Sequence, residues 1–238
     1  DLTVRLLVTR PAADAARTAA ALKARGHEVI VAPLLTIEYL PETALGDGPW
    51  STILVTSGNA AHAIAGHKRR DGLRRIPVFA VGKQTAQELR AQGFTDVTSA
   101  DGDVNDLADL VAARRKPPAL LLYLAGEERS GDLAGALRAK NFVVDTVVVY
   151  RTVAAQTLPE EATAALAAGI DGVLHYSRRS AGAFVAAARK SGLLEAALSK
   201  PVHYCLSARV AEPLAAAGAA DVRIATRPDE AALMSLCG

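Results

Sequence analysis

Short apolar runs alternate along the chain with longer stretches of helical periodicity. The runs are continuous rather than alternating, as at Leu6-Leu7-Val8, Ile53-Leu54-Val55 and Val202 to Leu206. A continuous run is typical of a parallel strand that is buried on both faces. Strands that alternate with helices of about a dozen residues predict βαβ units with right-handed crossovers. Glycines stand where three of these helices should end, in the left-handed conformation: Gly26, Gly93 and Gly218.

The same order of strands and helices occurs twice, in residues 4–112 and again in residues 119–235. For example, the run Ile53 to Ser57 and its following helix match Val173 to Ser177 and the helix after it. We therefore expect an α/β fold of two flavodoxin-like, doubly wound parallel-sheet lobes that arose by internal duplication.

Two extended segments fall at equivalent points of the two repeats, at residues 34–40 and 149–155. If both cross between the lobes, residues 1–37 join the C-terminal half and the middle of the chain forms the second lobe. Two strands lying side by side would then be the hinge. The residues alone leave open which strands share a lobe.

Ligands of open parallel sheets bind beyond the carboxyl ends of the strands. Small polar residues and arginines follow the predicted strands there, most of them at a helix start. A single Ser or Thr at such a position is typical of an N-cap, which stabilises a helix by ~1 kcal/mol. As a set, the helix N-termini favour an anionic ligand with several carboxylates or phosphates. The candidates are Arg10, Ser57, Gly82, Thr85, Gly126, Ser177, Arg178 and Ser207.

Charge and composition narrow the function classes. Lys and Arg number 27 against 25 Asp and Glu, a net charge of +2, which argues against a general nucleic-acid binder. Two cysteines are too few for a disulfide scaffold or a four-thiolate zinc site, so a reduced, cytoplasmic protein is expected. No apolar run approaches the ~18 residues that would span a bilayer.

The missing motifs argue against a cofactor or a metal. No G-x-G-x-x-G follows a strand, and no G-x-x-x-x-G-K-[ST] is present, so a dinucleotide site and an NTPase are not predicted. No His, Cys, Asp or Glu pair has metal-ligand spacing. His175 and His203 lie inside predicted strands, where we expect structural roles.

The whole chain resembles the uroporphyrinogen-III synthase family. The resemblance rests on the order and spacing of short motifs together with the duplication. The motifs are Leu7-Val8-Thr9-Arg10-Pro11, Pro33-Leu34-Leu35-Thr36-Ile37, Thr56-Ser57, Val81-Gly82-Lys83-Gln84-Thr85-Ala86, Gly126-Glu127, Val149-Tyr150-Arg151-Thr152 and Cys205-Leu206-Ser207-Ala208-Arg209-Val210-Ala211.

The resemblance implies the swapped arrangement, with residues 1–37 plus 153–238 in one lobe and residues 38–152 in the other. A two-stranded β connection joins the lobes, and the active site lies in the cleft between them. Linear hydroxymethylbilane loses water and closes to uroporphyrinogen III with its last ring inverted through a spiro intermediate. Neither a cofactor nor a metal is implied. We expect a cytoplasmic monomer that takes its substrate from hydroxymethylbilane synthase.

The resemblance also assigns roles to single residues. Tyr150 matches the family's functionally important tyrosine and is the expected acid, because a phenol keeps its proton at neutral pH. Thr85 matches a threonine that faces the cleft, and Ser57 and Ser177 match cleft serines. The second-lobe counterpart of Thr85 is Arg209 or Val210, so Ser207 is the expected substitute there.

One alternative from another class stays open at this point. Two similar lobes on a hinge also suit a non-catalytic binding or sensor module for a small polyanion. Formation of the type III product separates the two hypotheses.

Overall fold

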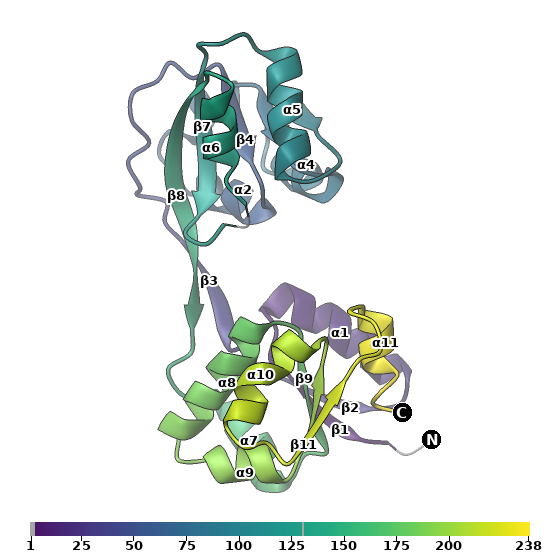
Figure 1. Cartoon of the computed structure of the whole chain (residues 1–238). Helices are drawn as coiled ribbons and strands as arrows, with labels where there is room; N and C mark the ends of the chain where they lie inside the picture. The colour runs from purple at the N-terminus through teal and green to yellow at the C-terminus, as the bar shows by residue number, and fades with distance from the viewer. Residues whose placement is uncertain (1–2, 130) are drawn as a thin grey trace. The chain divides into compact units, whose positions relative to one another are not determined.

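The computed structural model describes residues 3–129 and 131–238. The chain forms two compact units (Figure 1). Unit 1 comprises Asp1–Thr36 and Val153–Gly238, and unit 2 comprises Ile37–Thr152.

Unit 1 holds a five-stranded parallel sheet in the order β11-β10-β9-β1-β2. One face packs against α7, α8, α9 and α10, and the other packs against α1 and α11. Its elements are β1 (Arg5–Val8), α1 (Ala12–Ala24), β2 (Glu28–Val31), α7 (Glu160–Ala168), β9 (Gly172–His175), α8 (Arg178–Lys190), α9 (Leu194–Ser199), β10 (Val202–Cys205), α10 (Ala208–Ala216), β11 (Asp221–Ile224) and α11 (Glu230–Met234).

Unit 2 is built around a sheet in the order β3-β8-β7-β4-β5-β6. Helices α2, α3 and α4 cover one face, and α5 and α6 cover the other. The elements are β3 (Leu35–Tyr39), β4 (Thr52–Val55), α2 (Gly58–Ala65), α3 (Arg70–Leu73), β5 (Val78–Ala80), α4 (Lys83–Ala91), β6 (Val97–Ser99), α5 (Val104–Arg114), β7 (Leu120–Gly126), α6 (Leu133–Ala139) and β8 (Val143–Ala154).

Burial on both faces explains the continuous apolar runs. Leu6, Leu7 and Val8 of β1 are all fully buried, and each such side chain stabilises the fold by about 1.5–3 kcal/mol. The three glycines expected at helix ends have positive φ, as does Asn141 after α6. The predicted fold class, two α/β units with mainly parallel sheets, is confirmed.

The two sheets have one topology built from exchanged halves of the repeats. Numbered along the chain, the strands of unit 1 follow the flavodoxin-like order 2-1-3-4-5. By the sequence repeat, β7 and β8 of unit 2 correspond to β1 and β2, whereas β4, β5 and β6 correspond to β9, β10 and β11. Each unit therefore combines the two strands equivalent to β1 and β2 from one repeat with the three strands equivalent to β9, β10 and β11 from the other repeat.

The chain passes from one unit to the other in β3 and returns in β8, which lie side by side (Figure 1). Leu40 N–H donates to the Val149 carbonyl over 2.8 Å, and Ala155 N–H donates to the Leu34 carbonyl over 2.8 Å. The residue numbers of the two strands run in opposite directions, so this pair is antiparallel.

Candidate functional site

The predicted residues of unit 1 gather at the carboxyl edge of its sheet. Arg10, Ser177 and Ser207 each stand two positions beyond the end of β1, β9 and β10, which are neighbours in the sheet. Ser177 Oγ accepts the backbone N–H of Ser180 over 3.0 Å, and Ser207 Oγ accepts that of Val210 over 3.4 Å. Both serines are therefore N-caps, and both stand at the carboxyl edge of the sheet.

Arg10 is held in a polar cluster that the sequence did not reveal. Its guanidinium lies 3.9 Å from the centroid of the Tyr176 ring and 3.2 Å from Glu230 Oε1. Tyr176 donates its hydroxyl to the same Glu230 oxygen over 3.1 Å, and Thr18 donates to it over 2.8 Å. Burial raises the pKa of Tyr176 well above its ordinary value, so this phenol stays protonated.

Arg178 begins α8 and points to a different partner. Its Nε donates to Glu212 Oε2 over 2.9 Å, and both side chains are exposed. An exposed pair of this kind contributes at most about 1 kcal/mol. Arg178 can therefore exchange Glu212 for an incoming carboxylate at little cost in free energy.

The predicted residues of unit 2 gather at the carboxyl edge of the second sheet. Ser57, Gly82 and Gly126 follow or end β4, β5 and β7, and β4 lies between the other two. Ser57 caps α2 by accepting the Asn59 N–H over 3.3 Å. Gly82 precedes α4 with no atom within 4 Å of where its Cβ would be. Thr85 lies in the first turn of α4 and is 9% exposed.

Tyr150 leans over Gly126 because of an irregularity in the sheet. Ala125 pairs with Val148, but Gly126 pairs with Tyr150, so β8 carries one extra residue there. Such a bulge re-aims a side chain. A Cβ on Gly126 would lie 2.6 Å from Cζ and 2.7 Å from the hydroxyl oxygen of Tyr150. Gly126 thus provides the space that the phenol ring occupies.

A second phenol near this edge, Tyr123 of β7, was missed from the sequence. Its hydroxyl lies 3.1 Å from Thr56 Oγ1, and the ring is 3% exposed. Burial raises the pKa of Tyr123, with a smaller contribution in the same direction from Tyr150. The signal was available, since a tyrosine inside an apolar strand needs a hydrogen-bond partner for its hydroxyl.

The two strand histidines form a buried pair. His175 and His203 are fully buried, with His175 Nε2 3.0 Å from His203 Nδ1. His203 Nε2 lies 3.1 Å from the Ala197 carbonyl and must donate to it. His203 Nδ1 is then an acceptor, so His175 Nε2 carries the other proton. Burial lowers both pKa values, that of His203 to about 4, and both rings are neutral at pH 7.

Both cysteines are buried, and burial raises the pKa of the Cys205 thiol to about 12 and that of the Cys237 thiol to about 11. Within the described residues, no group of three or more His, Cys, Asp or Glu could hold a metal ion. No helix in the described part of the chain is both long and apolar enough to cross a membrane.

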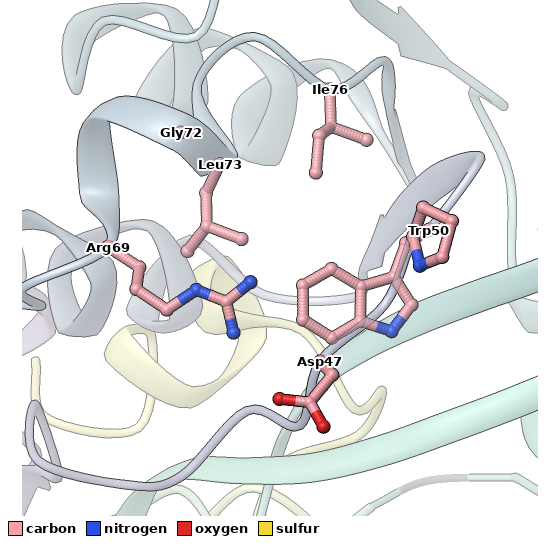
Figure 2. A pocket seen from close by; sticks show the side chains of 7 residues that line it. Asp47, Trp50, Arg69, Gly72, Leu73 and Ile76 are labelled. Atoms are coloured by element: carbon pink, nitrogen blue, oxygen red, sulfur yellow. The ribbon is translucent and has the colours of Figure 1, made fainter.

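A separate hollow of about 390 Å³ lies in unit 2 (Figure 2). Arg69 points its guanidinium toward the Trp50 ring, 5.0 Å from the ring centroid, and Trp50 Nε1 donates to Asp145 Oδ2 over 2.8 Å. Trp50 and Ile76 each precede a strand of the sheet, β4 and β5. This hollow therefore opens at the amino edge, away from Tyr150.

Comparisons with known proteins agree on one family. The family model described as uroporphyrinogen-III synthase HemD matches residues 16–235. A uroporphyrinogen-III synthetase structure from Helicobacter pylori is 19% identical over 99% of this chain and 98% of its own, with a TM-score of 0.65. A mutant uroporphyrinogen III synthase structure from the extremely thermophilic bacterium Thermus thermophilus is 18% identical over 99% and 97%, with a TM-score of 0.51. Among curated proteins, none matches the chain.

Proposed function

The chain belongs to the uroporphyrinogen-III synthase family, the cyclising lyases of tetrapyrrole synthesis, and we propose that Tyr150 is the proton donor of its reaction. The enzyme converts linear hydroxymethylbilane to uroporphyrinogen III. Family membership favours this catalytic function over the non-catalytic binding module.

The placement of Tyr150 over Gly126 carries the proposal. Gly126 ends β7 and Ser57 follows β4, and these neighbouring strands flank the point where the strand order of unit 2 reverses. Ligands of doubly wound sheets bind at such a switch point. The bulge in β8 holds the phenol over Gly126, at the carboxyl end of β7.

The chemistry needs one proton and a fixed geometry. The Tyr150 hydroxyl donates its proton to the departing hydroxyl group, the C–O bond breaks, and water leaves while a pyrrole nitrogen supplies the electron pair. The substituted carbon of the last ring attacks the resulting azafulvene and forms the spiro intermediate, which fragments and recloses with that ring inverted. The proton released as the ring regains aromaticity returns to the phenolate. Orientation decides the outcome, because the free bilane closes without inversion.

We propose that the remaining edge residues bind the eight substrate carboxylates. The helix N-termini offer backbone N–H groups and a favourable dipole. Arg10 and Arg178 replace their ion pairs with Glu230 and Glu212 by ion pairs with substrate carboxylates. That the edges of the two units share one active site stays a prediction. The edge residues proposed to bind the carboxylates are Arg10, Ser57, Gly82, Thr85, Gly126, Ser177, Arg178 and Ser207.

We further propose that the protein is a cytoplasmic monomer that receives the bilane from hydroxymethylbilane synthase. A short transit limits the uncatalysed closure to the type I isomer. Light scattering tests the proposed monomer, because it measures the mass of the particle in solution. In a coupled assay, a trap for free bilane should lower the type III yield less than diffusion through solution predicts; full sensitivity to the trap contradicts handover.

Tyr150→Phe tests the proton donor. General acids contribute about 10²–10⁴-fold, so turnover to the type III isomer should fall by a factor in this range, with the urea midpoint of unfolding little changed. Tyr204→Phe is the matched control, because it removes a strand phenol whose ring packs against Gly172 at the amino end of β9. Wild-type turnover in Tyr150→Phe removes this residue from the mechanism.

The assay also tests the function itself. Purified protein is supplied with hydroxymethylbilane made enzymatically in the same vessel, and the oxidised products are separated by chromatography. Type III product is expected from the wild-type protein. Type I product alone, at the rate seen without the protein, would leave the binding module as the better description.

A further inference from the structure

The antiparallel pair of β3 and β8 places a second phenol beside Tyr150. Arg151 Nε donates to Glu38 Oε2 over 2.8 Å, and Leu40 N–H donates to the Val149 carbonyl. These two contacts fix the register on either side, so Tyr39 lies directly opposite Tyr150. Directly opposed residues of an antiparallel pair point to the same face, with Cβ atoms about 4.5–5.5 Å apart.

Tyr150 therefore has a different neighbour on each side. The sheet order β3-β8-β7 puts Tyr39 on one flank and Gly126 on the other. One neighbour brings a large ring and the other brings no side chain. The bulge in β8 aims the Tyr150 ring toward Gly126, and this asymmetry favours the same direction, because the glycine side leaves room for the ring.

Tyr39 is itself supported by α2. Its ring centroid lies 6.1 Å from that of His62, with the two planes tilted by 39°. Glu88 Oε2 lies 3.9 Å from His62 Nε2, and Gln92 Nε2 lies 3.4 Å from His62 Nδ1. Gln92 is within hydrogen-bond distance of one ring nitrogen and the Glu88 carboxylate lies near the other, and the imidazole lies beside the phenol of Tyr39.

Glu88 also packs against a glycine, Gly58. A Cβ built on Gly58 would overlap the Glu88 carboxylate, so the carboxylate rests directly against the first residue of α2. Partial burial raises the pKa of Tyr39, and the Glu88 charge adds to the rise. Tyr39 nevertheless remains 40% exposed.

We propose that Tyr39, backed by His62 and Glu88, is a positioning residue that confines the Tyr150 ring to the Gly126 side. The inference rests on the proposed role of Tyr150 for its effect on activity, but not for its effect on structure. The bulk of the Tyr39 ring confines Tyr150, and the Tyr39 hydroxyl is not required.

Two readouts test the proposal separately. The first is a nuclear Overhauser contact between the Tyr150 ring protons and the Gly126 α-protons in tyrosine-labelled protein. It should be present in the wild type and in Tyr39→Phe, and lost in Tyr39→Ala. Contact of equal strength in Tyr39→Ala overturns the proposal, whatever the role of Tyr150 in catalysis.

The second readout is turnover to the type III isomer. Tyr39→Ala should lower kcat roughly tenfold, since a displacement of about 1 Å can cost 10²-fold and the freed ring leaves Gly126 only part of the time. KM should change by less than about twofold. Tyr39→Phe should restore kcat. Val143→Ala is the control, because it truncates another exposed hydrophobic side chain, at the start of the partner strand β8.

A double mutant distinguishes positioning from general damage. In the Tyr150→Phe background there is no hydroxyl to position, so Tyr39→Ala should lower kcat no further. An undiminished tenfold effect in that background overturns the proposal, as does a Tyr39→Phe variant as slow as Tyr39→Ala. Wild-type activity of Tyr150→Phe alone would instead count against the proposed proton donor and leave the structural readout standing.

Discussion

Gly126→Ala should disable the enzyme while leaving it folded. The added methyl group would lie 2.6–2.7 Å from two ring carbons and the hydroxyl oxygen of Tyr150. Carbon atoms in contact sit about 3.5–4.0 Å apart, so the ring has to retreat by about 1 Å. Tyr150 is half-buried and can move toward solvent, which the fixed backbone of Gly126 cannot do.

The expected magnitudes differ for activity and stability. Misplacing a reacting group by about 1 Å costs about 10²-fold in turnover. Overpacking costs about 1–3 kcal/mol in a closed core. It should stay near 1 kcal/mol here, because the ring has an exit and alanine limits the unfolded chain more than glycine does.

The assay measures type III product from enzymatically supplied bilane, alongside urea unfolding of the same preparation. Gly72→Ala is the control, since a Cβ on Gly72 meets no atom within 4 Å and should leave both quantities near wild type. In Tyr150→Phe, adding Gly126→Ala should have little further effect. Turnover within twofold of wild type for Gly126→Ala would refute the reasoning.

Two further predictions concern stability. Because folding lowers the pKa values of His175 and His203, the unfolded chain takes up protons first as the pH falls below about 6.5. Two such groups cost about 2–3 kcal/mol of stability per pH unit. The free energy of unfolding of unit 1, measured in urea, should therefore fall steeply from pH 6 to pH 4.5. A free energy that does not change with pH contradicts the neutral pair. Asp229→Ala removes the side chain that accepts the Ala232 N–H over 2.8 Å at the start of α11 and should cost about 1 kcal/mol, with Asp229→Asn close to wild type in the same measurement.

Most of the fold could be predicted from the sequence because burial on both faces leaves a strong pattern. Continuous apolar runs indicated the parallel strands, and Gly26, Gly93 and Gly218 indicated the helix ends. The positions after the strands were equally readable, since the carboxyl ends of parallel strands share one edge.

The contacts within the site could not be predicted in the same way. The lean of Tyr150 depends on a one-residue bulge, which changes the register without changing the apolar pattern. The pairing of Tyr39 with Tyr150 depends on the register of two strands more than a hundred residues apart in sequence. Arg10 was expected to await an anion, but Glu230 reaches it from α11 at the other end of the chain. Local spacing carries no trace of such long-range contacts.

The order of synthesis gives the crossing strands a consequence for folding. Unit 2 is one continuous segment, Ile37–Thr152, and its strands can all pair as soon as β8 has left the ribosome. Unit 1 has β1 in the middle of its sheet, between β2 and β9, so β1 must wait for a partner strand that is made only after the whole of unit 2. During that interval the apolar strand β1 has only β2 beside it. Because an unpaired edge of an apolar strand is prone to aggregation, the free edge of β1 is where unit 1 is most vulnerable during synthesis.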